Sequence, residues 1–324
     1  MAESFTNTEL ILWMTVFSLE SLAIIVGNTI SIVVFWKQRS TLKRTSYLLI
    51  NLSVADLMVG VGVINDIVCL PIRNNVCQIS EKTNLVDATC GIASLSFLVL
   101  IALERLYAIV SPLRRRTTKT STYFYFIGAT WIVSAMLIIT TYSIFSYLSL
   151  DHILQPVVIS TFTASCLIII SVAYLTIFIY STKDDPRLAI NRRQQNKKLA
   201  KTLFIVTLLS VMTWIPHGVT NVLRTMTGKK EGDAYLAGQI CRLANSLVNP
   251  IIYSYRMPEF RKTLRNIFAC KGKIRERQSQ LSQLENTSWV EAPPVLLSFS
   301  RLEVSDLSPS WSTTGGKNTT GEHY

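Results

Sequence analysis

The chain has 324 residues, of which 49% are hydrophobic and only 16% are charged, against ~25% charged residues in an average soluble domain. Its net charge of +12 lies mainly in four clusters, at 37–44, 114–119, 183–201 and 256–273, each of which follows an apolar segment. Clusters placed in this way orient a membrane protein, so we expect no nucleic-acid partner.

Seven apolar segments predict an all-α bundle of seven membrane-spanning helices over residues 10–256. A helix needs about 20 apolar residues to cross a hydrocarbon core of ~30 Å. The predicted spans are 10–36, 45–70, 83–111, 121–147, 155–181, 198–224 and 234–255. Because the basic clusters follow alternate spans, we expect residues 1–9 to be extracellular and the C-terminus to be cytoplasmic.

The chain after the bundle changes character twice. Phe260, Leu264, Ile267 and Phe268 recur at helical spacing among basic residues, which predicts a short amphipathic eighth helix on the inner membrane surface within 257–270. Cys270 at its end is a candidate for palmitoylation. Residues 271–324 are rich in Ser, Thr, Pro and Gly, and we predict a disordered cytoplasmic tail.

Polar side chains at mid-depth of the spans suggest a cation site. A carboxylate inside a membrane needs polar partners or a cation. Asn245 and Asn249 are four residues apart and share one helix face. Together with Asp56 and the Ser94 hydroxyl they would form an oxygen-rich cage for Na⁺ at Asp56. A network of hydrogen bonds that only ties the helices together is the alternative, and the spacing leaves both open.

Two further features lie in the third and sixth spans. Glu104 and Arg105 are adjacent at the inner end of the third span, where they can pair with each other. An arginine that extends its head group into water is the alternative for that position. Pro216, two residues after Trp214, removes a backbone donor and predicts a kink in the sixth span.

These residues together resemble the motifs of rhodopsin-like (class A) G-protein-coupled receptors. The motifs fall in family order on the predicted spans: Asn28, Leu52-Ser53-Val54-Ala55-Asp56, Glu104-Arg105-Leu106, Trp131, Trp214-Ile215-Pro216 and Asn249-Pro250-Ile251-Ile252-Tyr253. The resemblance covers residues 10–268. It implies a receptor that changes between two packings of its helices when a ligand binds.

The resemblance also assigns roles to single residues. It implies a sodium site at Asp56, Ser94, Asn245 and Asn249, with Na⁺ as an allosteric ion and no other cofactor. It implies that Glu104 and Arg105 couple to the G protein. The activation switch that it implies consists of Trp214, Pro216, Pro250, Tyr253 and Tyr174.

Several departures from the family pattern narrow the branch. The loop between the fourth and fifth spans has no Cys, so the usual disulfide to the third helix is missing. Cys77 has Cys69 as its one plausible outer partner, and a disulfide or a free thiol are both open. A receptor with these departures resembles the branch that holds the melanocortin, cannabinoid and lysophospholipid receptors. The stretch from Asn245 to Arg261 resembles the adenosine receptors of the same broad group. Asn196 stands where the family has an acidic latch, which favours basal activity.

The outer half of the bundle is the expected ligand site. Asp87 matches the aspartate that anchors amine ligands in the family, and Asp66 lies near the same pocket. Arg242 could instead pair with Asp87 and leave no site for an amine. Asn221 matches the asparagine that grips the purine in adenosine receptors. The candidate ligand residues are Asp66, Asp87, His217, Asn221, Gln239 and Arg242, and amine, adenosine-like, lipid and peptide ligands stay open.

The resulting hypothesis is a multi-pass receptor of the plasma membrane that is not an enzyme, because the sequence has no nucleophile–base arrangement or metal-ligand spacing. Its expected partners are a small extracellular ligand, a heterotrimeric G protein, arrestin, receptor kinases and membrane lipids. A seven-helix protein that binds a ligand without G-protein coupling is the alternative.

Overall fold

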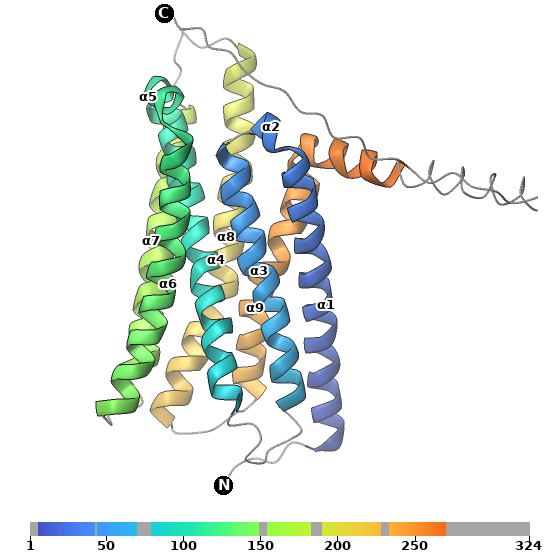
Figure 1. The fold of residues 1–324 in the computed structure, drawn as a ribbon, viewed down its shortest axis with the longest axis vertical. Coiled ribbons are helices and arrows are strands. Elements are labelled where there is room, and N and C mark those ends of the chain that lie inside the picture. Colours follow the sequence, from blue (N-terminus) through green and yellow to red (C-terminus); the bar gives the residue numbers. More distant parts are fainter. Residues whose placement is uncertain are drawn as a thin grey trace, which may run out of the picture. The chain divides into compact units, whose positions relative to one another are not determined.

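Long helices account for nearly all of the structure, a computed structural model that describes residues 6–42, 44–69, 79–148, 154–182, 190–227 and 233–269 (Figure 1). The long helices are α1 (Asn7–Lys37), α3 (Arg44–Cys69), α4 (Ile79–Val110), α6 (Thr120–Leu148), α7 (Leu154–Thr182), α8 (Ile190–Thr227) and α9 (Asp233–Arg256). Two short helices, α2 (Arg39–Leu42) and α5 (Pro112–Thr117), and a helix at 258–269 complete the described part.

The helix boundaries follow from local chemistry. The Thr6 side chain accepts a hydrogen bond from the Glu9 backbone N–H at 3.3 Å, and the Glu9 carboxylate accepts one from the Thr6 N–H at 2.8 Å. This capping box satisfies two donors that a helix start leaves unpaired, and it sets the beginning of α1. Pro112 occupies the first turn of α5, where its missing N–H costs nothing.

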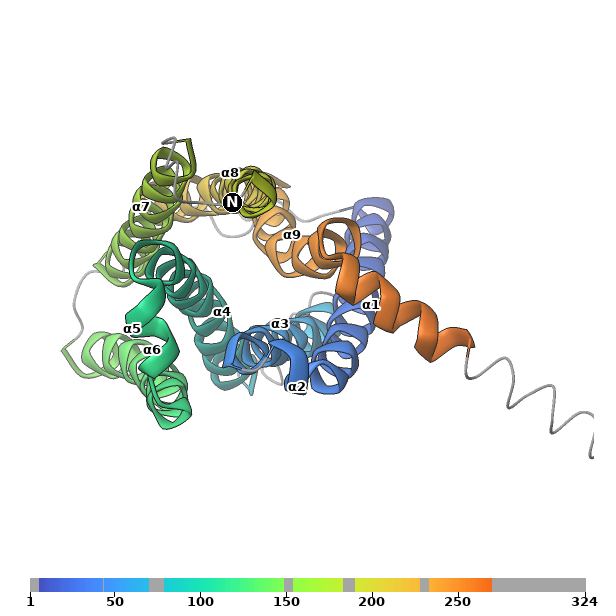
Figure 2. The same cartoon turned by 90° about the horizontal axis from the view of Figure 1, so that it is seen from above.

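The helices form a ring in which α1, α3, α4, α7, α8 and α9 each pack against the next, and α9 packs back against α1 (Figure 2). Helix α6 lies outside the ring against α4. The Trp131 indole N–H on α6 donates to the Asn51 side-chain oxygen on α3 at 3.1 Å, which fixes α6 to the ring. Gly60 allows a close approach, because a Cβ there would lie 2.8 Å from Ile24 Cγ2 on α1.

Within the described residues, five helices are long and apolar enough to cross a membrane: α1, α3, α4, α6 and α7. Helix α9 falls below that hydropathy because it carries buried polar side chains, among them Arg242, Asn245 and Asn249. They face the bundle and not the lipid. The predicted all-α fold with seven long helices is confirmed, and each predicted span corresponds to one of them.

The helix at 258–269 continues the bundle after a one-residue break at Met257. Phe260 is fully buried, and its ring lies 5.3 Å from that of Phe35 on α1 and 6.1 Å from that of Tyr253 on α9. The predicted amphipathic eighth helix is therefore present and packed against α1 and α9. The predictions for Cys270 and for the tail at 271–324 lie outside the described residues.

Candidate functional site

A carboxylate in the middle of the bundle collects three hydrogen bonds from two helices. The Ser94 hydroxyl on α4 donates to Asp56 Oδ1 at 2.5 Å, and the Ser246 hydroxyl on α9 donates to the same oxygen at 2.8 Å. The Asn249 side-chain N–H donates to Oδ2 at 2.8 Å. All four side chains are buried, so Asp56 on α3 ties α4 and α9 together.

This arrangement brings together most of the predicted sodium site. Asp56, Ser94 and Asn249 meet as the sequence suggests, and Ser246 joins them. Asn245 is buried, but it is not among the partners of Asp56 in the described part of the chain. One carboxylate and two hydroxyl groups supply the oxygen donors that a hard cation prefers, so the residues fit Na⁺. Asn28 on α1 adds a hydrogen bond to the Ser246 carbonyl at 3.1 Å.

An ion pair lies nearer the end of the bundle where α1 begins, which we call the Asn7 end. Arg242 Nη2 on α9 lies 2.9 Å from Asp87 Oδ2 on α4, and both side chains are largely buried. Arg242 Nε donates to Gln239 Oε1 at 2.8 Å, and Gln239 Nε2 donates to the Tyr235 hydroxyl at 2.6 Å. Of the two possibilities that the sequence leaves open, the structure shows the internal pair.

Other polar groups surround this pair. Glu20 on α1 and His217 on α8 both lie within electrostatic range of Arg242. Glu20 Oε2, Asp87 Oδ1 and His217 Nδ1 are buried atoms without a hydrogen-bond partner among the described residues. Gly91 leaves room for the guanidinium, because a Cβ there would lie 3.3 Å from Arg242 Nη1.

The other predicted ligand residues are less well defined. His217 on α8 packs edge-on against Trp214, with ring centroids 6.1 Å apart. Asn221 is partly buried on the same helix. The Asp66 side chain, Cys69 and Cys77 lie outside the described side chains, so the predicted acid and the predicted disulfide stay predictions.

A second charged group lies at the opposite end of the bundle, which we call the Lys37 end. Arg115 on α5 donates to Glu104 Oε1 from Nη2 at 2.6 Å and from Nε at 2.9 Å. The expected partner Arg105 is more distant, with Nε 3.7 Å from Glu104 Oε2. Burial lowers the pKa of the Arg115 guanidinium, but Glu104 and Tyr123 together raise it by more, so the net pKa lies above its ordinary value. Arg115 therefore stays charged at any physiological pH.

The predicted switch residues lie between these two ends. Trp214 is buried on α8, and its indole N–H has no partner among the described residues. Tyr174 on α7 is buried within electrostatic range of Arg105 and of Tyr253. Pro216 and Pro250 lie inside α8 and α9. The Tyr253 ring packs against Phe35 at 5.1 Å, so in this packing it contacts α1.

Three participants were not selected from the sequence. Glu20 is the only acid in the predicted span 10–36, and the rarity of such residues in membrane spans is a signal that could have identified it. Ser246 is a polar residue of the seventh span, but its contact with Asp56 depends on the rotation of α9. Arg115 belongs to a run of three arginines, and only the turn into α5 selects which one reaches Glu104.

Comparison with known proteins gives this arrangement its family. Residues 27–253 match the 7 transmembrane receptor (rhodopsin family). The chain belongs to this receptor family. The matched range contains the Asp56 cluster, the Asp87–Arg242 pair and the Glu104 cluster.

Relatives of this receptor include proteins named for different ligands. It is 26% identical to the dog adenosine receptor A3 over 287 residues, which cover 79% of this chain and 90% of that protein. It is 25% identical to the zebrafish galanin receptor 2a over 333 residues, covering 89% and 87%. It is also 25% identical to the guinea pig neuropeptide Y receptor type 2 over 297 residues, covering 79% and 76%. The chain is thus a multi-pass G-protein-coupled receptor by family.

Proposed function

We propose that this receptor resides in the plasma membrane, binds a small extracellular ligand at the Asn7 end and promotes nucleotide exchange on a heterotrimeric G protein at the Lys37 end. It acts as a receptor and not as an enzyme. The distribution of charge supports this topology, since the helix ends and connections at the Lys37 end carry most of the basic side chains. These are Lys37, Arg39, Arg44, Arg114, Arg115, Lys119, Arg256, Arg261, Lys262 and Arg265.

The observation that carries this proposal is the Asp87–Arg242 pair. Helix α9 carries Arg242, and one and two turns further along it carries Ser246 and Asn249, which bond Asp56. A ligand that competes for either member of the pair changes how α9 sits against α4. That change alters the support of Asp56 and shifts the population between two packings.

The ion pair between Asp87 and Arg242 bears on the class of ligand. A simple amine would have to displace a guanidinium that lies 2.9 Å from Asp87. We therefore favour a nucleoside-like or peptide ligand that contacts Arg242, Gln239 and Asn221 over an amine held by Asp87. Relatives named as adenosine, galanin and neuropeptide Y receptors support both of the favoured classes.

We further propose that Asp56, Ser94, Ser246 and Asn249 hold Na⁺ in the inactive packing. The ion would supply a positive charge that offsets the buried carboxylate. The two hydroxyl groups would turn their lone pairs toward it, and the Asn249 amide would keep Asp56 in place from the opposite oxygen. Asn245 stays a predicted member of the same site.

Nucleotide exchange in membranes tests this function. Mixed G proteins are added to membranes that contain either the parent receptor or one of its variants, Asp87→Asn or Arg242→Leu. Amines, adenosine, peptides and lysophospholipids are tested as ligands. Asp233→Asn is the matched control. Asp233 is an exposed acid at the same end of the bundle, and it accepts a hydrogen bond from the Trp13 indole. We expect amines to fail on the parent and Arg242→Leu to gain basal activity. Amine activation of the parent that is lost in Asp87→Asn would overturn the ligand assignment.

A further inference from the structure

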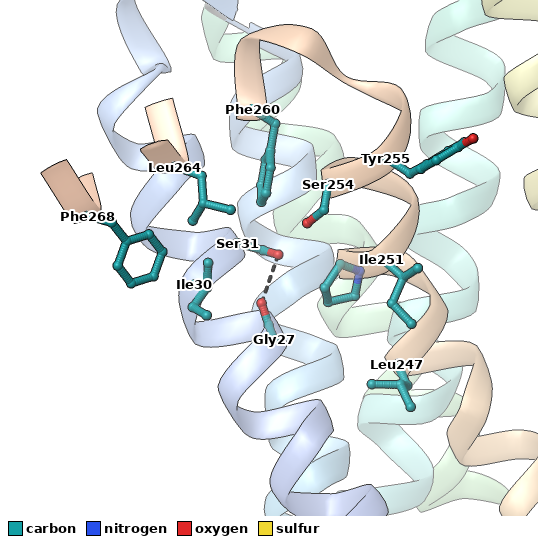
Figure 3. A pocket seen from close by; sticks show the side chains of 11 residues that line it. Gly27, Ile30, Ser31, Leu247, Ile251, Ser254, Tyr255, Phe260, Leu264 and Phe268 are labelled. Atoms are coloured by element: carbon teal, nitrogen blue, oxygen red, sulfur yellow. Dashed lines mark hydrogen bonds between the residues drawn. The ribbon is translucent and has the colours of Figure 1, made fainter. Parts of the chain in front are cut away.

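A groove of about 440 Å³ lies on the outside of the bundle near the Lys37 end (Figure 3). Helices α1 and α9 and the helix at 258–269 form its walls, and almost all the lining surface is apolar. Lining residues from the three helices include Gly27, Ile30, Ile251, Tyr255, Leu264 and Phe268. Ile251, Tyr255 and Phe268 are more than half exposed, so the groove opens to the surroundings of the bundle.

The deepest lining residue on α1, Gly27, lies about one membrane leaflet from the Lys37 end. Gly27 is ten residues before Lys37, which corresponds to ~15 Å along α1 and to half of a ~30 Å hydrocarbon core. At this depth α1 meets α9, because a Cβ on Gly27 would lie 3.1 Å from Pro250 Cγ. The groove therefore begins beneath the helix at 258–269 and ends near the bilayer midplane.

Two arginines are held at Tyr255, where the groove meets the Lys37 end. The Arg256 guanidinium lies 5.5 Å from the centroid of the Tyr255 ring. Arg261 Nη1 donates to the Tyr255 carbonyl at 2.9 Å. Arg256 is partly exposed and Arg261 is exposed, so both can contact a group at the membrane surface.

We propose that this groove binds one anionic phospholipid, with an acyl chain in the groove and the net negative head group on Arg256 and Arg261. The apolar walls alone would not choose between lipids, since lipid tails are as apolar as leucine. The two guanidinium groups beside the groove supply the choice, because a basic residue next to a lipid head group at the membrane surface favours an anionic lipid roughly fivefold. The proposal rests on the cytoplasmic position of the Lys37 end, where anionic lipids are abundant.

Native mass spectrometry of the purified receptor with equal amounts of phosphatidylserine and phosphatidylcholine tests the head-group site. We expect bound phosphatidylserine to exceed phosphatidylcholine. Arg256→Gln with Arg261→Gln should lower that ratio roughly 25-fold. The matched control, Lys262→Gln with Arg265→Gln, removes the same charge from two exposed positions of the helix at 258–269 and should change the ratio less than twofold. Equal uptake of both lipids, or equal effects of the two double variants, would overturn the proposal.

Two tryptophan substitutions test the groove itself. Leu264→Trp and Ile251→Trp fill it from opposite walls, and each should reduce uptake of both lipids while the thermal midpoint of the receptor stays within a few degrees. If the Cys270→Ser variant takes up phospholipid and the parent does not, then an acyl group attached to Cys270 occupies the groove. A lipid-free dimer that both tryptophan variants disrupt would assign the groove to a second copy. Either result would overturn the proposal, and neither bears on nucleotide exchange.

Discussion

Breaking the Asp87–Arg242 pair from one side should destabilise the receptor strongly. At 2.9 Å the gross attraction is about 6 kcal/mol for an effective dielectric constant of ~20, and desolvation of both charges offsets much of it. In Arg242→Leu the carboxylate stays buried without its partner, which costs about 3–5 kcal/mol. In Asp87→Asn the buried Arg242 guanidinium likewise loses its carboxylate partner. The double variant removes both charges, so it should lose no more stability than either single variant.

Unfolding of the purified receptor can be followed with a thiol-reactive dye, because Cys90 and Cys166 are buried free thiols. The double-mutant cycle should give a coupling free energy of at least ~2 kcal/mol, well above the ~0.5 kcal/mol within which independent sites add. Asp233→Asn provides the control and should change stability by less than ~1 kcal/mol, since it removes one exposed hydrogen bond. Additive single variants would refute the pairing.

Three further predictions concern other parts of the bundle. Arg115→Gln should raise basal nucleotide exchange severalfold because Glu104 loses its shortest partner, whereas the exposed neighbour Arg114→Gln should not; exchange without ligand is the measurement. Asp56→Asn should abolish the effect of Na⁺ on agonist affinity, and an unchanged sodium response in binding assays would contradict the proposed cation site. Gly60→Val should lower thermal stability by about 1–3 kcal/mol, since its side chain overlaps Ile24 and α1 must shift.

The sequence predicts the fold well because the membrane constrains it. Every backbone polar group must be paired inside the bilayer, so apolar segments of about 20 residues become helices. The amphipathic helix at 258–269 was also predictable, because Phe260 and Leu264 share a face. The capping box at Thr6 places the start of α1 three residues earlier than hydropathy alone indicates.

The sites were predictable in kind but not in detail. The sequence places Asp56, Ser94 and Asn249 at similar depth, and the structure adds the hydrogen bonds between them. It cannot choose between an open and a paired Asp87, because that depends on the side-chain direction of Arg242. It also cannot select Arg115 as the partner of Glu104, because the direction in which α5 leaves α4 determines which arginine reaches Glu104.

The most direct test of the account links the two ends of the bundle. G-protein nucleotide exchange is measured without ligand in membranes that contain the parent, Arg242→Leu, or Arg242→Leu combined with Arg105→Ala. Arg242→Leu should raise exchange severalfold, and the added Arg105→Ala should return it to background. Exchange that stays at the level of receptor-free membranes in all three would contradict coupling to a G protein, and an increase that persists without Arg105 would contradict its assigned role.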